Sequence, residues 1–208
     1  MAIERNYQPH LWPEGPTVGV RTCNARWELM YDLLEKHVAP DGTVVDIGSA
    51  QGWFPITIAQ TWPDSFVVSV EEDLDAASLQ RELIAANGLA NVRLLNDRWD
   101  GVSLHPFGVG VDVTLMLSVL HWMDDPAVAF KSALTMSECV IVESPDPGDE
   151  GACGQSKLSE IGEITKWIAQ FDVAEVGLLG RVPRHTSHRD AWMVYAIPSS
   201  SSSSGSSS

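Results

Sequence analysis

Apolar residues along the chain follow two patterns, and the two patterns alternate. In the first, apolar and β-branched residues run with little interruption, as in VVDI at 44–47 and VVSV at 67–70. In the second, apolar residues recur every three or four positions, as in the segment 24–38. Continuous runs are typical of strands covered on both faces, whereas the periodic segments predict amphipathic helices. Their alternation predicts an α/β protein with a mostly parallel sheet.

The strands and helices can be placed by residue number. We expect strands at 44–47, 65–73, 91–97, 111–120, 138–145, 173–182 and 190–197. We expect helices at 24–38, from the first strand to about 61, and at 75–87, 125–135 and 156–171. No helix separates the last two strands, so they form an antiparallel pair. The prediction is an open, mostly parallel seven-stranded sheet with an antiparallel C-terminal strand and helices on both faces.

Two local features refine this outline. Asn24 is the expected N-cap of the first helix, and Pro40 stands just beyond its end. The third and fourth strands are joined only by the short segment RWDGVSLHPFGVG at 98–110. We therefore expect the helix of that crossover to be short or missing.

Composition limits the classes of function. The 208 residues suffice for one α/β domain, and 44% of them are hydrophobic, as in a globular chain. The net charge of −15 argues against a surface that follows nucleic-acid phosphates, because such proteins concentrate Lys and Arg. Cys23, Cys139 and Cys153 have no metal-ligand spacing and predict a reduced, cytoplasmic setting. Neither a membrane span nor the apolar core of a signal peptide is evident.

Polar residues stand at the ends of the first three predicted strands. Asp46, in the first strand, is followed by Gly48 and Gly52. Glu71 ends the second strand, and Asn96–Asp97 end the third. Ligands of open α/β sheets bind beyond such strand ends, where glycines let the backbone approach and the next helix offers free N–H groups. Each residue alone also fits a turn, a cap or a solvated charge, but their succession indicates one ligand site.

This constellation resembles the class I S-adenosylmethionine-dependent methyltransferases, over residues 24–197. The family's first motif, an acid followed by spaced glycines, corresponds to DIGSAQG at 46–52. The middle glycine of that motif is Ala50 here, and its methyl group narrows the turn. The resemblance implies S-adenosyl-L-methionine as cofactor, with Asp46 acting on its ammonium group directly or through water. It also implies that Glu71 receives the two ribose hydroxyls.

The resemblance implies the rest of the cofactor site as well. Asp97 corresponds to the side chain that accepts from the adenine amine, with the Arg98 backbone beside it. LSVLHWMDD at 117–125 resembles the family's fourth motif, in which backbone near Leu117 and Ser118 holds the methionine end. The expected cofactor-binding residues are Arg21, Asp46, Gly48, Ser49, Ala50, Gly52, Glu71, Glu72, Asn96, Asp97, Arg98, Leu117 and Ser118.

The chain divides into three expected segments. Residues 1–23, rich in Pro and Gly, form an irregular lid segment, 24–197 form the methyltransferase-like domain, and the Ser-rich 198–208 form a disordered tail. In the lid, Tyr7, His10 and Trp12 supply aromatic surface.

Five side chains near the expected site have individual interpretations. Arg21 is the expected partner of the cofactor's carboxylate or of an acidic acceptor, whereas Arg26 is expected to form an ion pair on the helix surface. Trp53 is expected to pack, and Trp99 is a candidate to lie against the adenine. A general base is needed only if the acceptor holds a proton at neutral pH, and His121, past the fourth strand, is the candidate.

No metal site is predicted. His185 and His188 lack a third ligand, and the acidic loop with Asp146, Asp149 and Glu150 fits a solvated loop better than a cation site.

Several functions stay open. The first is methyl transfer to a small-molecule or saccharide-like acceptor, favoured by the acidic composition and the single domain. The second is a non-catalytic binding or scaffold subunit that keeps the cofactor fold. The third is an RNA methyltransferase, which would need a basic rim. A nicotinamide enzyme is disfavoured, because it needs Gly-x-Gly-x-x-Gly where this chain has GSAQGW at 48–53.

Overall fold

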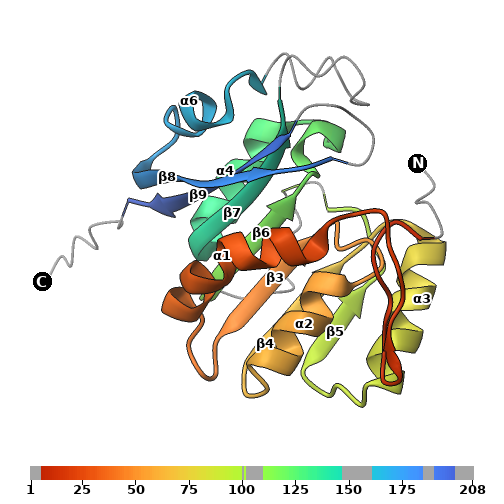
Figure 1. Cartoon of the computed structure of the whole chain (residues 1–208). Coiled ribbons are helices and arrows are strands. Elements are labelled where there is room, and N and C mark those ends of the chain that lie inside the picture. Colours follow the sequence, from red (N-terminus) through yellow and green to blue (C-terminus); the bar gives the residue numbers. More distant parts are fainter. Residues whose placement is uncertain (1–5, 100, 102–109, 147–160, 185–189, 200–208) are drawn as a thin grey trace, which may run out of the picture.

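A computed structural model describes residues 6–99, 101, 110–146, 161–184 and 190–199 (Figure 1). Within these ranges, seven strands form one sheet in the order β5-β4-β3-β6-β7-β9-β8. Their bounds are β3 (Thr43–Ile47), β4 (Phe66–Val70), β5 (Val92–Leu95), β6 (Val111–Leu117), β7 (Ser137–Pro145), β8 (Val173–Val182) and β9 (Ala191–Pro198). The first five pair in parallel, and β9 lies antiparallel between β7 and β8. The predicted fold class is confirmed.

Helices cover both faces of the sheet (Figure 1). They are α1 (Cys23–His37), α2 (Trp53–Thr61), α3 (Leu74–Ala86), the 3₁₀ turn η1 (Leu120–Trp122), α4 (Pro126–Met136) and α6 (Ile164–Ile168). Neighbouring residues of a strand point to opposite faces. Val44 therefore packs in the core formed with α1 and α2, and Val45 packs in the core formed with α4 and α6. Two covered faces explain why the strands are continuously apolar.

Local chemistry sets where the helices begin. Asp73 and Asp125 are the N-caps of α3 and α4, and their side chains accept from backbone N–H groups of the first turn. The N-cap of α1 is Thr22 rather than the predicted Asn24. Thr22 Oγ1 and its carbonyl oxygen instead accept from Arg26 Nη1, at 2.7 and 3.1 Å.

Several other predictions can be compared with the described ranges. The N-terminal segment, expected to be irregular, contains a short hairpin of β1 (Leu11–Trp12) and β2 (Gly15–Pro16). The crossover at 98–110 lies mostly outside the described residues, as do residues 156–160 of the last predicted helix. None of the helices in the described ranges is both long and apolar enough to cross a membrane.

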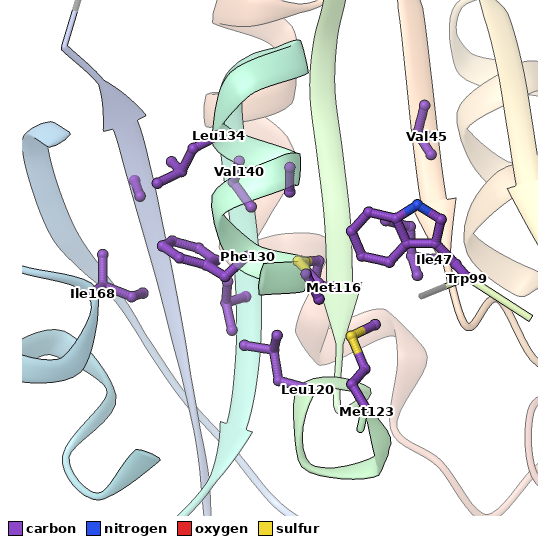
Figure 2. Close-up of a cluster of buried hydrophobic side chains, with 14 of the residues drawn as sticks. Val45, Ile47, Trp99, Met116, Leu120, Met123, Phe130, Leu134, Val140 and Ile168 are labelled. Atoms are coloured by element: carbon purple, nitrogen blue, oxygen red, sulfur yellow. The ribbon is translucent and has the colours of Figure 1, made fainter. Parts of the chain in front are cut away.

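The core between α4 and the sheet should be sensitive to cavity formation (Figure 2). Phe130 is fully buried, and its ring packs on those of Trp167 and Phe171 with centroids 5.3 and 5.0 Å away. Phe130→Ala should lower the free energy of unfolding by about 3–5 kcal/mol in urea denaturation. Val128→Ala, at an exposed position of the same helix, should change it by less than about 0.5 kcal/mol. Equal losses in the two variants would contradict this packing.

Candidate functional site

The connection from β3 to α2 is a tight left-handed turn. The φ angle is +71° at Gly48, +53° at Ala50 and +87° at Gly52. The two glycines also meet close neighbours: a Cβ on Gly48 would lie 2.7 Å from Val119 Cγ2, and one on Gly52 would lie 2.5 Å from Gln80 Cγ. Ala50 adopts the left-handed conformation despite its methyl group, at a cost of about 1–2 kcal/mol. The backbone therefore bends sharply just beyond the buried carboxylate of β3.

Hydrogen bonds from the end of β4 hold this turn. The Val70 carbonyl oxygen accepts from the N–H of Gly48, at 2.9 Å. Glu71 follows Val70, and its carboxylate accepts from the N–H of Ala50 at 2.7 Å and from the N–H of Asp73 at 2.8 Å. Glu71 is buried, which raises the pKa of its carboxyl group, although these two N–H groups act in the opposite direction. The second predicted acid is thus fixed against the glycine turn.

The end of β5 lies beside the end of β4. Asn96 Nδ2 donates to the Glu71 carbonyl oxygen, at 2.8 Å. The exposed Asp97 accepts from the backbone N–H of Arg98, at 2.8 Å. Glu72 is also exposed and lies 3.8 Å from the Arg98 guanidinium. These residues therefore form the outer, solvated side of the arrangement.

The three predicted acids Asp46, Glu71 and Asp97 lie at the same end of three neighbouring strands. β3, β4 and β5 are neighbours in the sheet, and their register aligns the last residues of the three strands. Asp46, Glu71 and Asp97 therefore lie at one edge of the sheet, as the sequence predicted.

A buried ion triad closes the other side of this edge. Arg26 binds both carboxylate oxygens of Glu143, at 2.8 Å from Nε and 2.9 Å from Nη2. Arg21 Nη2 lies 2.6 Å from the same carboxylate, and Ser118 Oγ donates to it at 2.7 Å. Ser118 ends the buried stretch that includes Leu117 and has a φ of +61°. The side chains of all three charged residues are at most 5% exposed.

The triad corrects one prediction and adds a residue that sequence reasoning missed. Arg26 does form an ion pair, but in the interior rather than on the helix surface. Burial alone would raise the pKa of Glu143, but Arg21 and Arg26 outweigh it and hold that pKa well below its usual range. The carboxylate within the apolar run CVIVESP was the available signal, since it repeats the pattern of Asp46 in VVDI.

The N-terminal segment is attached to the turn and to the triad. The N–H of Gln8 donates to Gln51 Oε1 at 2.7 Å, and Gln8 Oε1 accepts from the N–H of Trp53 at 3.1 Å. The Tyr7 hydroxyl accepts from Arg21 Nη1 at 2.5 Å, and the two backbones are hydrogen-bonded at 2.8 Å. The side-chain oxygen of Gln8 therefore binds the first backbone N–H of α2, that of Trp53, which is then not free for a ligand.

The tip of this segment lies elsewhere. Asn87, at the end of α3, donates from Nδ2 to the Leu11 carbonyl oxygen at 2.7 Å. The hairpin follows α3 away from the strand ends (Figure 1). Of the predicted aromatic surface, Tyr7 therefore contacts the site, whereas His10 and Trp12 lie with the hairpin.

Within the described residues, five buried side-chain atoms lack a hydrogen-bond partner. One of them is His37 Nε2, at the far end of α1. The other four are Arg21 Nε, Asp46 Oδ2, Trp99 Nε1 and His121 Nδ1. The Arg21 charge acts on both Asp46 and His121, whereas Trp99 belongs to the core between α4 and the sheet. An unpaired buried polar group costs about 1–3 kcal/mol, so a polar ligand that met the Arg21, Asp46 or His121 atom would be stabilised there.

Burial shifts the pKa values of Asp46 and His121 in opposite directions. It raises the pKa of Asp46 to about 7; Arg21 opposes the shift and Glu71 adds to it. For His121, burial is again the main cause and, together with Arg184 and Arg21, lowers the pKa to about 4. His121 is therefore neutral at pH 7.

The remaining predicted residues have mixed outcomes. Trp53 packs on Phe54 and Trp27, as expected for a core residue. Trp99 lies in the core near Ile47 (Figure 2), with its indole N–H among the unpaired atoms. His185, His188, Asp149, Glu150 and Cys153 lie outside the described residues. Among the residues that are described, no three His, Cys, Asp or Glu side chains are grouped to hold a metal ion.

Comparison with solved structures shows which class of fold this is. The chain has the Rossmann-like fold of class I S-adenosylmethionine-dependent methyltransferases. No family model matches the sequence, and no curated protein matches it.

Three solved proteins illustrate the likeness. The bifunctional kinase-methyltransferase WbdD has a TM-score of 0.77 and 20% identity, over 94% of this chain and 45% of the WbdD chain. The N-terminal domain of EvdMO1 with SAH bound has a TM-score of 0.59 and 14% identity, over 86% of this chain and 81% of that domain. A SAM-dependent methyltransferase from Aquifex aeolicus has a TM-score of 0.60 and 15% identity, over 84% of this chain and 93% of that protein. This chain spans less than half the length of WbdD.

The raised pKa of Asp46 predicts a pH-dependent effect of Asp46→Asn. The folded pKa of about 7 exceeds the ordinary 3.8, so the protein loses stability as pH rises through this window. Removing the charge should stabilise the ligand-free protein by roughly 4 kcal/mol at pH 8 and by about 2 kcal/mol at pH 5. Urea denaturation at both pH values measures the difference.

Asp64→Asn, at an exposed position, is the control and should change stability by less than about 0.5 kcal/mol at either pH. An Asp46→Asn effect that is equal at pH 5 and pH 8 would show that Asp46 is ionised throughout this range.

Proposed function

We propose that the protein is an S-adenosylmethionine-dependent methyltransferase that acts on a small-molecule or saccharide-like acceptor. One observation carries the proposal: the buried edge of the sheet presents an unpaired carboxylate oxygen, Asp46 Oδ2, and an unpaired guanidinium N–H, Arg21 Nε. The amino-acid end of the cofactor has an ammonium group and a carboxylate. Its two charges match these two atoms.

The other strand ends fit the rest of the cofactor. Both Glu71 oxygens keep a lone pair beyond the two N–H groups they bind, so they can accept from the ribose hydroxyls. In this proposal Asp97 accepts from the adenine amine, with the Arg98 backbone beside it, and backbone near Leu117 and Ser118 holds the methionine end. The proposed set is completed by Gly48, Ser49, Ala50, Gly52, Glu72 and Asn96.

The protein's part in catalysis is chiefly positioning. When bound, S-adenosylmethionine supplies an activated methyl group for in-line displacement. The residues around it have to align the acceptor and exclude water, which can contribute up to roughly 7–11 kcal/mol in ideal cases. The N-terminal segment, held by Gln8 and Arg21, is the proposed lid. His121 is neutral and has a free Nδ1, so it can accept a proton or a hydrogen bond from an acceptor hydroxyl.

The acceptor class rests on weaker support. The net charge of −15 disfavours RNA. The EvdMO1 N-terminal domain has also been crystallised in the presence of SAH and D-fucose, which favours a saccharide for a chain of similar fold. A non-catalytic subunit that retains cofactor binding is the second candidate, because the low pKa of His121 makes it a weak base.

Cofactor binding is the first test. S-adenosylhomocysteine (SAH), the demethylated product, should bind in isothermal titration, and Glu71→Ala should weaken binding by at least about 10-fold through loss of two charge-assisted hydrogen bonds. Glu82→Ala removes an exposed carboxylate from α3 and should leave the affinity unchanged. Absence of binding by the unmodified chain at millimolar SAH would overturn the proposal.

Turnover separates an enzyme from a scaffold. Radiolabelled cofactor and a size-fractionated extract should yield label in low-mass material, whereas label in RNA would overturn the proposed acceptor class. With an acceptor identified, His121→Ala should keep SAH affinity and lower kcat by about 10²-fold or more, as expected when a general base is lost. An unchanged kcat would remove His121 from the mechanism.

A further inference from the structure

Three buried polar side chains beneath the turn 48–52 hydrogen-bond to one another. Gln80 Nε2 donates to Ser69 Oγ at 2.6 Å, and Ser69 Oγ donates to Ser49 Oγ at 2.6 Å. Ser49 Oγ in turn donates to Gln80 Oε1, at 3.2 Å. The three come from α3, β4 and the glycine turn, and none is more than 1% exposed. They form a closed ring inside the protein.

The hydrogen bonds run around the ring in one direction. Each side chain donates once and accepts once within it, and Ser49 Oγ also lies 3.4 Å from the Val70 carbonyl oxygen, a second acceptor in the same interior. Hydrogen bonds in a closed chain polarise one another, and in a low-dielectric interior such a network holds a single geometry. The position of Ser49, the second residue of the turn, is therefore tied to α3.

Gln80 meets the turn at a second point. Gln80 packs so closely on Gly52 that a Cβ atom on Gly52 would lie only 2.5 Å from Gln80 Cγ. Gln80 thus touches the last residue of the turn by packing and Ser49 by a hydrogen bond. It is a buried support under both ends of the turn.

The turn passes this constraint on to Glu71. Between the two supported ends, the N–H of Ala50 donates to the Glu71 carboxylate at 2.7 Å. A displaced turn would move this donor and the carboxylate together.

We propose that Gln80 is a positioning residue of the cofactor site, which holds the turn 48–52 and, through it, Glu71 in the cofactor-binding geometry. The inference rests on the proposed function, since it concerns the same site. A purely structural role would be different: the ring would only dock α3 onto the sheet, and its loss would lower stability without changing the affinity of the folded protein.

The test measures SAH affinity and stability in parallel. Gln80→Met keeps the length of the side chain but removes both hydrogen bonds of the amide. Isothermal titration should show at least about 10-fold weaker SAH binding, the equivalent of about 1.4 kcal/mol. Circular dichroism confirms that the variant is folded at the titration temperature.

Ser137→Ala is the matched control. Thr114 and Ser137 share a buried hydroxyl pair, 2.6 Å apart, and Ser137 begins β7, at the end of the strand opposite to the candidate site. Ser137→Ala should lower the melting temperature and leave SAH affinity unchanged. If Gln80→Met does not fold, Ser69→Ala breaks the same ring with a smaller change and should weaken SAH binding by about 5-fold.

The outcomes separate the two proposals. If the unmodified chain binds SAH and the affinity is unchanged in Gln80→Met and Ser69→Ala, the positioning role is wrong and the proposed function stands. An equal loss of affinity in Ser137→Ala would also overturn the positioning role, because it would reflect general destabilisation. If the unmodified chain does not bind SAH, both proposals fail.

Discussion

The carboxylate of Glu143 joins four parts of the molecule at one point. It belongs to β7, it is bound from α1 by Arg26 and from the N-terminal segment by Arg21, and it accepts from Ser118 at the end of β6. A buried ion pair is not by itself a strong source of stability, because desolvation offsets the attraction. Removing one partner, however, leaves an uncompensated buried charge, so the arrangement specifies how the N-terminal segment and α1 meet the sheet.

The same contacts explain why Asp46 differs from Glu143. Both are fully buried acids in the strands of one sheet, yet the pKa of Asp46 is raised and that of Glu143 is lowered. The two pKa values differ because the two carboxylates have different hydrogen-bond partners. Glu143 is in direct contact with two guanidinium groups, whereas one Asp46 oxygen has no hydrogen-bond partner. A ligand cation would complete at Asp46 what the arginines complete at Glu143. In the proposed function, the two similar buried acids thus have different roles: Glu143 is neutralised within the protein, and Asp46 is left to bind the cofactor.

The sequence was informative where structure depends on local pattern. Continuous apolar runs identified the strands, and acids at successive strand ends identified the edge where Asp46, Glu71 and Asp97 meet, because parallel topology alone brings such positions together. The partners of Glu143 and the contacts of Gln8 could not be predicted. Arg26 and Glu143 are 117 residues apart, and Gln8 reaches Trp53 across 45 residues. These contacts depend on how α1 and the N-terminal segment pack against the sheet, and the residue pattern of a short segment does not predict that packing.

The course of the N-terminal segment has a practical consequence. Its outgoing and returning backbones cross beside the site, where Val20 and Arg21 pair with Asn6 and Tyr7. At this crossing a Cβ on Gly19 would lie 2.3 Å from the backbone nitrogen of Pro9. The residues between these two pairs thus form a loop whose ends are held together by backbone hydrogen bonds. The length of the loop does not change where Arg21 meets the site. Its tip is a suitable place to graft an epitope or a fluorescent reporter.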